Sequence, residues 1–140
     1  MRQVFDMSRE LAERLAGAAE MQAGAIGILV AVAVVDRGGH PVVAVRMDGA
    51  ATCAWAIALS KAETAAATLA PTAAWYASTQ PGQPDWGFHT ASAGRYTCMP
   101  GGLPVIVAGE VIGAISISGG ESAQDAACAE AALRAVTPAA

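Results

Sequence analysis

Two expected β-hairpins constrain the fold of this chain more than any other feature. They lie within residues 30–50 and residues 100–120. In both, runs of apolar and β-branched residues flank a short turn that contains glycine, which is the sequence signature of a hairpin. Each hairpin leads into an expected helix. The polar residues fall at the ends of the strands, where loops on a rigid sheet usually carry function.

Helices are expected around these hairpins. The first covers residues 6–21, where apolar residues recur at helical spacing, and Gly24 ends it. The second is the alanine-rich and nearly uncharged stretch 47–69, which Pro71 stops. A short helical piece is expected to follow at residues 72–78.

The last helix is expected to open at Ser122, with Asp125 completing a capping box. Within it, Glu130 and Arg134 have the spacing of an ion pair. Residues 79–97 are irregular, and a loop this long in a compact domain is usually functional or flexible; its aromatic and charged residues favour function. The order is helix, two strands, helix, loop, about three strands, helix. It predicts an α+β fold in which helices pack on an antiparallel sheet.

The composition narrows the class of protein. A length of 140 residues predicts a single domain over residues 1–140. With 54% apolar and only 14% charged residues, the chain has little polar surface, so we expect a homo-oligomer. The net charge of −4 and the lack of a basic run argue against a nucleic-acid partner.

We also expect no membrane partner, because no stretch reaches the roughly 18 apolar residues that span a bilayer. The N-terminal residues are mixed in charge and do not form a secretory signal, which favours the cytoplasm, although a mature exported form would look the same. Cys53, Cys98 and Cys128 are widely spaced and contain no C-x-x-C pair. We interpret them as buried free thiols on helices and a strand, with no zinc site.

Lys61 is the first candidate for chemistry, because it is the only lysine beside seven arginines. A lysine in apolar surroundings can act as a base, a Schiff-base nucleophile or an anion ligand. Alternatively, it extends to solvent along its apolar stem. Arg46 and Asp48 end the first hairpin: Arg46 could bind a carboxylate, and Asp48 could contact the ligand or cap the next helix. For Asp36 the turn itself is the better explanation.

His40 and His89 are the two histidines, and either could bind haem iron or move protons near neutral pH. His40 lies in a turn before a proline, where simple exposure is the alternative. His89 has Trp86 and Phe88 beside it and Arg95 nearby, which resembles an apolar pocket with a few polar groups. Our first choice of iron ligand is therefore His89, with His40 second.

Taken together, several segments resemble the GlcG/HbpS family, which also includes a C-terminal domain of some propanediol-utilisation adenosyltransferases. The resembling segments recur in order over nearly the whole chain: Val34–His40, Arg46–Ala50, Ser60–Ala65, Pro100–Val105, Gly113–Gly120 and Gln124–Asp125.

This resemblance implies a profilin-like α/β/α arrangement with a five-stranded antiparallel sheet. It also implies dimers or larger rings with a pocket near a subunit interface. Its motifs are structural and pocket-forming, which adds Thr64, Gly101 and Gly102 to the ligand-binding candidates. Some members bind haem and others are linked to small organic acids, so fold transfers better than function.

Two hypotheses follow. The first is an oligomeric small-ligand-binding protein, with haem as the first ligand to test. The second is a cofactor-independent enzyme, a deaminase, isomerase or hydrolase, that acts on a small carboxylated metabolite. In that enzyme Arg46 would hold the carboxylate, and Lys61 or His89 would transfer a proton or attack a carbonyl.

Overall fold

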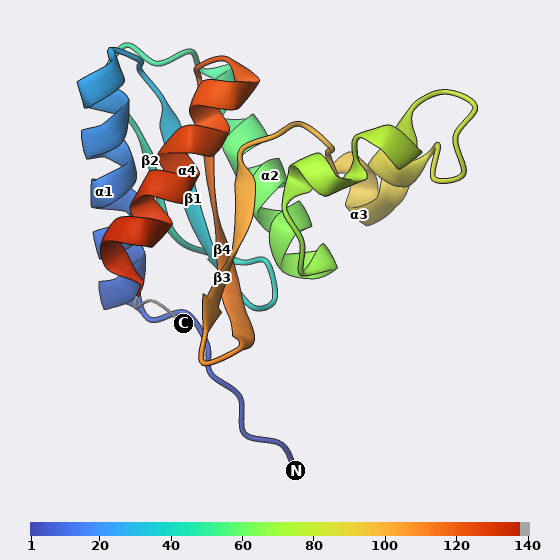
Figure 1. Cartoon of the computed structure of the whole chain (residues 1–140), viewed down its shortest axis with the longest axis horizontal. Coiled ribbons are helices and arrows are strands. Elements are labelled where there is room, and N and C mark those ends of the chain that lie inside the picture. Colours follow the sequence, from blue (N-terminus) through green and yellow to red (C-terminus); the bar gives the residue numbers. More distant parts are fainter. Residues whose placement is uncertain (138–140) are drawn as a thin grey trace.

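A four-stranded antiparallel sheet forms the centre of the fold (Figure 1). The computed structural model describes residues 1–137. The strands lie in the order β2-β1-β4-β3. Their bounds are β1 Ala31–Asp36, β2 Pro41–Arg46, β3 Gly102–Val107 and β4 Glu110–Ser118. Both expected hairpins are thus confirmed, and β1 pairs with β4 to join them into one sheet.

The expectation of five strands, about three of them after the loop, is wrong. Residues 95–101, which precede β3, form no strand. The backbone N–H of Thr97 donates instead to the side-chain oxygen of Thr64, 3.0 Å away. At Thr97 this segment therefore hydrogen-bonds to a side chain of the helix that carries Thr64, and it does not extend the sheet.

Helices cover both faces of the sheet. Helix α1 (Arg9–Ile26) and helix α4 (Ser122–Val136) pack together on one face, and α2 (Cys53–Thr68) packs on the other. Figure 1 shows these three layers. The α+β class is therefore confirmed.

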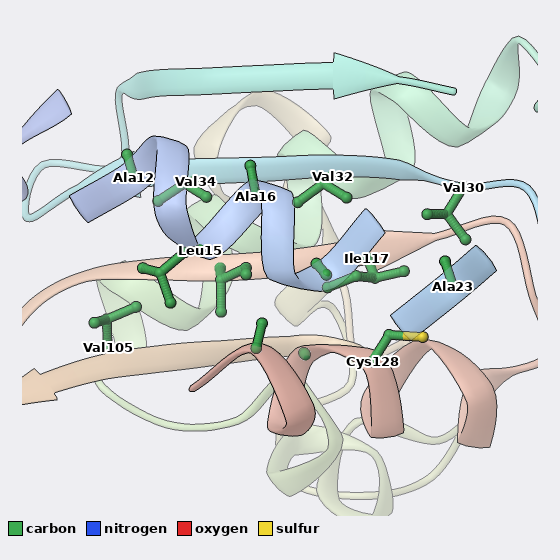
Figure 2. Close-up of a cluster of buried hydrophobic side chains, with 14 of the residues drawn as sticks. Ala12, Leu15, Ala16, Ala23, Val30, Val32, Val34, Val105, Ile117 and Cys128 are labelled. Carbon is green, nitrogen blue, oxygen red and sulfur yellow. The ribbon is translucent and has the colours of Figure 1, made fainter. Parts of the chain in front are cut away.

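The two faces of the sheet bury different residues. Val30, Val32 and Val34 point toward α1 and α4 and join the larger core, part of which Figure 2 shows. The alternate residues of β1 point toward α2, which meets them with alanines. Because alanine side chains are small, α2 lies close to the sheet, and the hydroxyl of Ser116 donates to the carbonyl oxygen of Ala58.

The helix ends differ from the sequence predictions. Helix α1 begins after Ser8, whose side chain accepts from the N–H of Leu11, and runs past Gly24 to end at Gly27. The burial of Ala23 explains this, because packing outweighs the roughly 1 kcal/mol that a glycine costs inside a helix.

Helix α2 begins six residues later than expected, at Cys53. Its N-cap position is Thr52, so Asp48 does not cap it; Asp48 is exposed in the turn after β2. Helix α4 does begin at Ser122, but its capping partners are Glu121 and Gln124. The side chain of Asp125 is drawn into the interior instead.

The expected helical piece after Pro71 is confirmed as two short 3-10 helices, η1 (Thr72–Trp75) and η2 (Ala77–Thr79). Two further short elements, η3 (Phe88–Thr90) and α3 (Ala91–Gly94), follow in the irregular segment. Figure 1 shows that this part of the chain projects from one side of the body. We call residues 72–97 the arm.

All three cysteines are free thiols, as expected, but only Cys128 is buried. Cys53 is exposed at the start of α2, and Cys98 lies in the coil before β3 and not in a strand. Within residues 1–137 we find no helix with both the length and the hydropathy to cross a membrane.

Candidate functional site

The β1–β2 turn places His40 beside helix α2. The side chain of Asp36 organises this turn, because its Oδ1 accepts from the backbone N–H groups of Gly38 at 2.8 Å and His40 at 2.9 Å. The turn role expected for Asp36 is therefore confirmed. The same Oδ1 lies 3.3 Å from Nδ1 of the His40 ring, which is otherwise exposed.

A first pocket opens between this turn, helix α2 and the end of the arm. Its volume is about 360 Å³, and it brings together His40, Glu63 and Arg95. The carboxylate of Glu63 accepts from Nε of Arg95 at 2.8 Å and from the hydroxyl of Ser92. The pocket is therefore polar, and its charges are already partly paired.

A second pocket lies in the arm and contains the aromatic candidates. Its volume is about 280 Å³. It is lined by Thr79, Gln80, Trp86, Phe88, His89 and Cys98. The rings of Trp86 and His89 lie 5.1 Å apart and are tilted, so the sequence neighbours do meet in space.

The aromatic residues of the arm support this second pocket. Phe88 stacks on Trp75 with ring centroids 4.8 Å apart, and the ring centroid of Tyr96 lies 5.3 Å from that of Phe88. The indole N–H of Trp75 is buried and has no acceptor among the described residues. Trp86 and His89 are exposed, so the pocket is open to solvent on their side.

Lys61 lies in neither pocket. Its Nζ atom donates to the carboxylate of Asp125 at 3.0 Å and to the carbonyl oxygen of Ile117 at 2.9 Å. The side chain is only 3% exposed, so Lys61 does not extend to solvent as the alternative interpretation supposed. Burial lowers the pKa of Lys61, and the charge and hydrogen bond of Asp125 oppose this effect.

Gly101 and Gly102 form part of the wall around Lys61. A Cβ atom on Gly101 would lie 2.9 Å from Nζ of Lys61, and one on Gly102 would lie 2.5 Å from the carbonyl oxygen of Lys61. Both glycines are buried. Their role in this structure is to let the lysine and its helix approach the start of β3.

Arg46 and Thr64 complete the set of candidates. Arg46 is exposed at the end of edge strand β2. Strand β1 lies between it and β4, whose Ile117 contacts Lys61, so Arg46 and Lys61 are separated by about 10 Å of sheet. The structure does not bring these two cations together. Thr64 is buried, and its hydroxyl oxygen fixes the end of the arm through Thr97.

Two acidic partners were missed by sequence reasoning. Asp125 lies 64 residues from Lys61, and Glu63 lies 32 residues from Arg95. One signal was available for Asp125, because a lone lysine in an alanine-rich buried helix needs a carboxylate partner. For Glu63 the sequence offered no comparable signal.

The antiparallel sheet has helices α1 and α4 on one face and α2 on the other, which defines a small α+β domain. Its pocket beside the β1–β2 turn is polar, and its pocket in the arm is mainly aromatic and apolar. The chain belongs to the haem degrading protein HbpS-like family, whose model matches residues 7–134. It is 35% identical over 112 residues to Protein GlcG of Escherichia coli K12, covering 80% of this chain and 81% of that protein. The GlcG/HbpS resemblance is therefore confirmed.

The fold also occurs in solved structures of related proteins. The Klebsiella pneumoniae protein ORFY is 36% identical, with a TM-score of 0.93 over 96% of this chain and 92% of that one. The structure of a PduOC:heme complex is 30% identical, with a TM-score of 0.89 over 94% of this chain and 95% of that one. The second of these was solved with haem.

Proposed function

We propose that this protein is a small-ligand-binding protein whose ligand is haem, bound in the pocket of the arm with His89 as the iron ligand. The observation that carries the proposal is the pairing of an imidazole with aromatic walls in one pocket, His89 with Trp86 and Phe88. The family name and the PduOC:heme complex support haem as the first ligand to test.

The residues of this pocket suit haem in their chemistry. An imidazole is a common axial ligand of haem iron, and aromatic rings provide apolar area for a porphyrin. When bound, haem supplies an iron centre for electron transfer or oxygen chemistry.

His40 is the alternative iron ligand in this proposal. Histidine ligands of metals usually donate from their second ring nitrogen to a carboxylate or carbonyl, and Asp36 lies 3.3 Å from Nδ1 of His40. However, the pocket around His40 is lined by Glu63 and Arg95 and offers no aromatic wall. The apolar surroundings favour His89.

The proposal includes a second copy of the chain at this pocket. A volume of about 280 Å³ is just below the usual range of ligand pockets, which is about 300–1,000 Å³. Trp86 and Tyr76 of the same arm are exposed. Association of two chains through the arm would bury these rings and enclose the ligand.

The enzyme hypothesis has less support. It requires Arg46 to hold a carboxylate in the same site as Lys61 or His89, either of which would transfer a proton or attack a carbonyl. The ammonium of Lys61 already donates to Asp125 and Ile117, and β1 separates it from Arg46. His89 alone would remain as a proton-transfer group.

A haem titration tests the proposal. We expect the wild-type protein to shift the Soret band of added haem, and we expect His89→Ala to change that band and weaken binding at least ten-fold. His40→Ala is the matched control and should retain the wild-type spectrum. An unchanged spectrum in His89→Ala with a changed one in His40→Ala would move the ligand to His40. A wild-type protein that binds no haem would contradict the proposed function.

A further inference from the structure

Glu63 lies between the two segments that carry the histidines. On one side it contacts the β1–β2 turn, where a Cβ atom on Gly39 would lie only 3.2 Å from Cγ of Glu63. On the other side its carboxylate accepts from Nε of Arg95 at 2.8 Å and from the hydroxyl of Ser92. One side chain of helix α2 thus contacts both the turn and the end of the arm.

The part of the arm that contacts Glu63 has an unfavourable backbone conformation. Ser92 and Ala93 have φ angles of 52° and 56°, and Gly94 has 81°. The left-handed conformation brings Cβ close to the following carbonyl oxygen, so residues other than glycine avoid it, especially in succession. A segment like this persists when its surroundings impose it. Here the hydrogen bonds to Ser92 and Arg95 are the contacts that do so.

These contacts form a closed set around the carboxylate. Nη2 of Arg95 also donates to the hydroxyl of Ser92 at 2.9 Å, so Glu63, Ser92 and Arg95 are mutually bonded. The Glu63 side chain is 20% exposed, whereas that of Arg95 is 56% exposed. The fixed partner is therefore the glutamate on the rigid helix, and the arm is the part that it holds.

We propose that Glu63 is a positioning residue of the ligand site, which holds the arm in the conformation that presents His89 and its aromatic neighbours. This inference rests on the proposed function only for its effect on ligand binding. The effect on the arm can be measured without any ligand. Glu63 itself touches neither His89 nor the aromatic pocket, so it acts through Ser92 and Arg95.

Hydrogen exchange of the full-length protein without ligand tests the effect on the arm. Glu63→Met keeps the length of the side chain but removes both acceptors, and Glu63→Gln keeps one. We expect exchange of the amides of Arg95 and Thr97 to be at least ten-fold faster in Glu63→Met, with an intermediate rate in Glu63→Gln. The amides of β4 serve as the internal reference and should not change.

The matched control is Glu13→Gln. Glu13 pairs with Arg9 at 2.7 Å on the exposed surface of α1, so this variant also removes one carboxylate from an ion pair. Its arm should exchange as in the wild type. If Glu63→Met fails to fold, the exchange rates of Glu63→Gln alone decide whether Glu63 holds the arm. Wild-type exchange at Arg95 and Thr97 in a folded Glu63 variant would overturn the inference.

A haem titration then tests positioning. We expect Glu63→Gln to weaken haem binding at least three-fold while the iron keeps its wild-type Soret position, because His89 is still present. Haem affinity equal to the wild type, despite faster exchange in the arm, would overturn the positioning role. If the wild type binds no haem, the proposed function fails, and the exchange result still decides whether Glu63 holds the arm.

Discussion

The Nζ atom of Lys61 lies 3.0 Å from Oδ2 of Asp125 and joins helices that cover opposite faces of the sheet. Lys61 belongs to α2, and Asp125 lies in the first turn of α4. Oδ1 of the same carboxylate accepts from the N–H of Gly120 at 2.8 Å. The pair therefore connects both helices to the end of strand β4.

Lys61→Met should lower the free energy of unfolding by about 3–5 kcal/mol, because it leaves the carboxylate of Asp125 buried without its partner. The double variant Lys61→Met/Asp125→Asn should lose less than the sum of the single changes, since it leaves no buried charge. Urea unfolding measures both. Arg9→Met is the control, because its exposed pair with Glu13 is worth only about 0–1 kcal/mol. A Lys61→Met protein as stable as the wild type would contradict a structural role for the pair.

Gly101→Ala should destabilise the protein, whereas Gly17→Ala should not. A Cβ atom on Gly101 would lie 2.8 Å from the carbonyl oxygen of Ile117 and close to Lys61, and the φ angle of 121° disfavours any side chain. A Cβ on Gly17, inside α1, meets nothing within 4 Å. We expect a loss of about 1–3 kcal/mol for Gly101→Ala and a gain of up to about 1 kcal/mol for Gly17→Ala. Thermal unfolding of the two variants side by side gives the comparison, and equal midpoints would refute it.

The contacts of the arm should loosen in acid. Burial raises the pKa of Glu63, but the hydrogen bonds from Arg95 and Ser92 and the charges of Arg95 and His40 outweigh it, so the pKa lies below its ordinary 4.5. A carboxyl group with a lowered folded-state pKa contributes stability that is present above 4.5 and lost as the pH falls through the folded value.

Hydrogen exchange of the arm amides should therefore become faster, and tryptophan fluorescence should change, as the pH is lowered below 4.5. The Glu63→Gln variant should lack these changes. Trp75 and Trp86 report on the arm, whereas Trp55 lies on α2. The same acid transition in wild type and Glu63→Gln would assign it to other groups.

Light scattering at micromolar concentration should give a mass that is a multiple of 14.0 kDa. The reason is the low charge and the exposed aromatic residues of α2 and the arm, Trp55, Tyr76 and Trp86. Trp86→Glu should shift the protein toward smaller species. Met21→Glu replaces an exposed apolar residue on α1, away from the arm, and should not. A wild-type monomer would contradict the second copy in the proposed site.

Local patterns in the sequence were sufficient for much of the fold. The two hairpins, the turn organised by Asp36 and the pair of Glu130 with Arg134 were all predicted, because each depends on residues close together in the chain. The expected fifth strand does not form, because the backbone N–H of Thr97 donates to a side chain of α2. No local sequence pattern indicates this contact.

The amino-acid sequence by itself determined the antiparallel hairpins, the presence of the main helices and the family resemblance, since periodicity, turn residues and the order of motifs can be read directly along the chain. Only the tertiary structure decided which charges meet. It removed Lys61 from the candidate site by pairing it with Asp125, and it placed Glu63 between the β1–β2 turn and the arm. Such pairings depend on how the helices pack across the sheet, which brings together residues that are distant in the sequence.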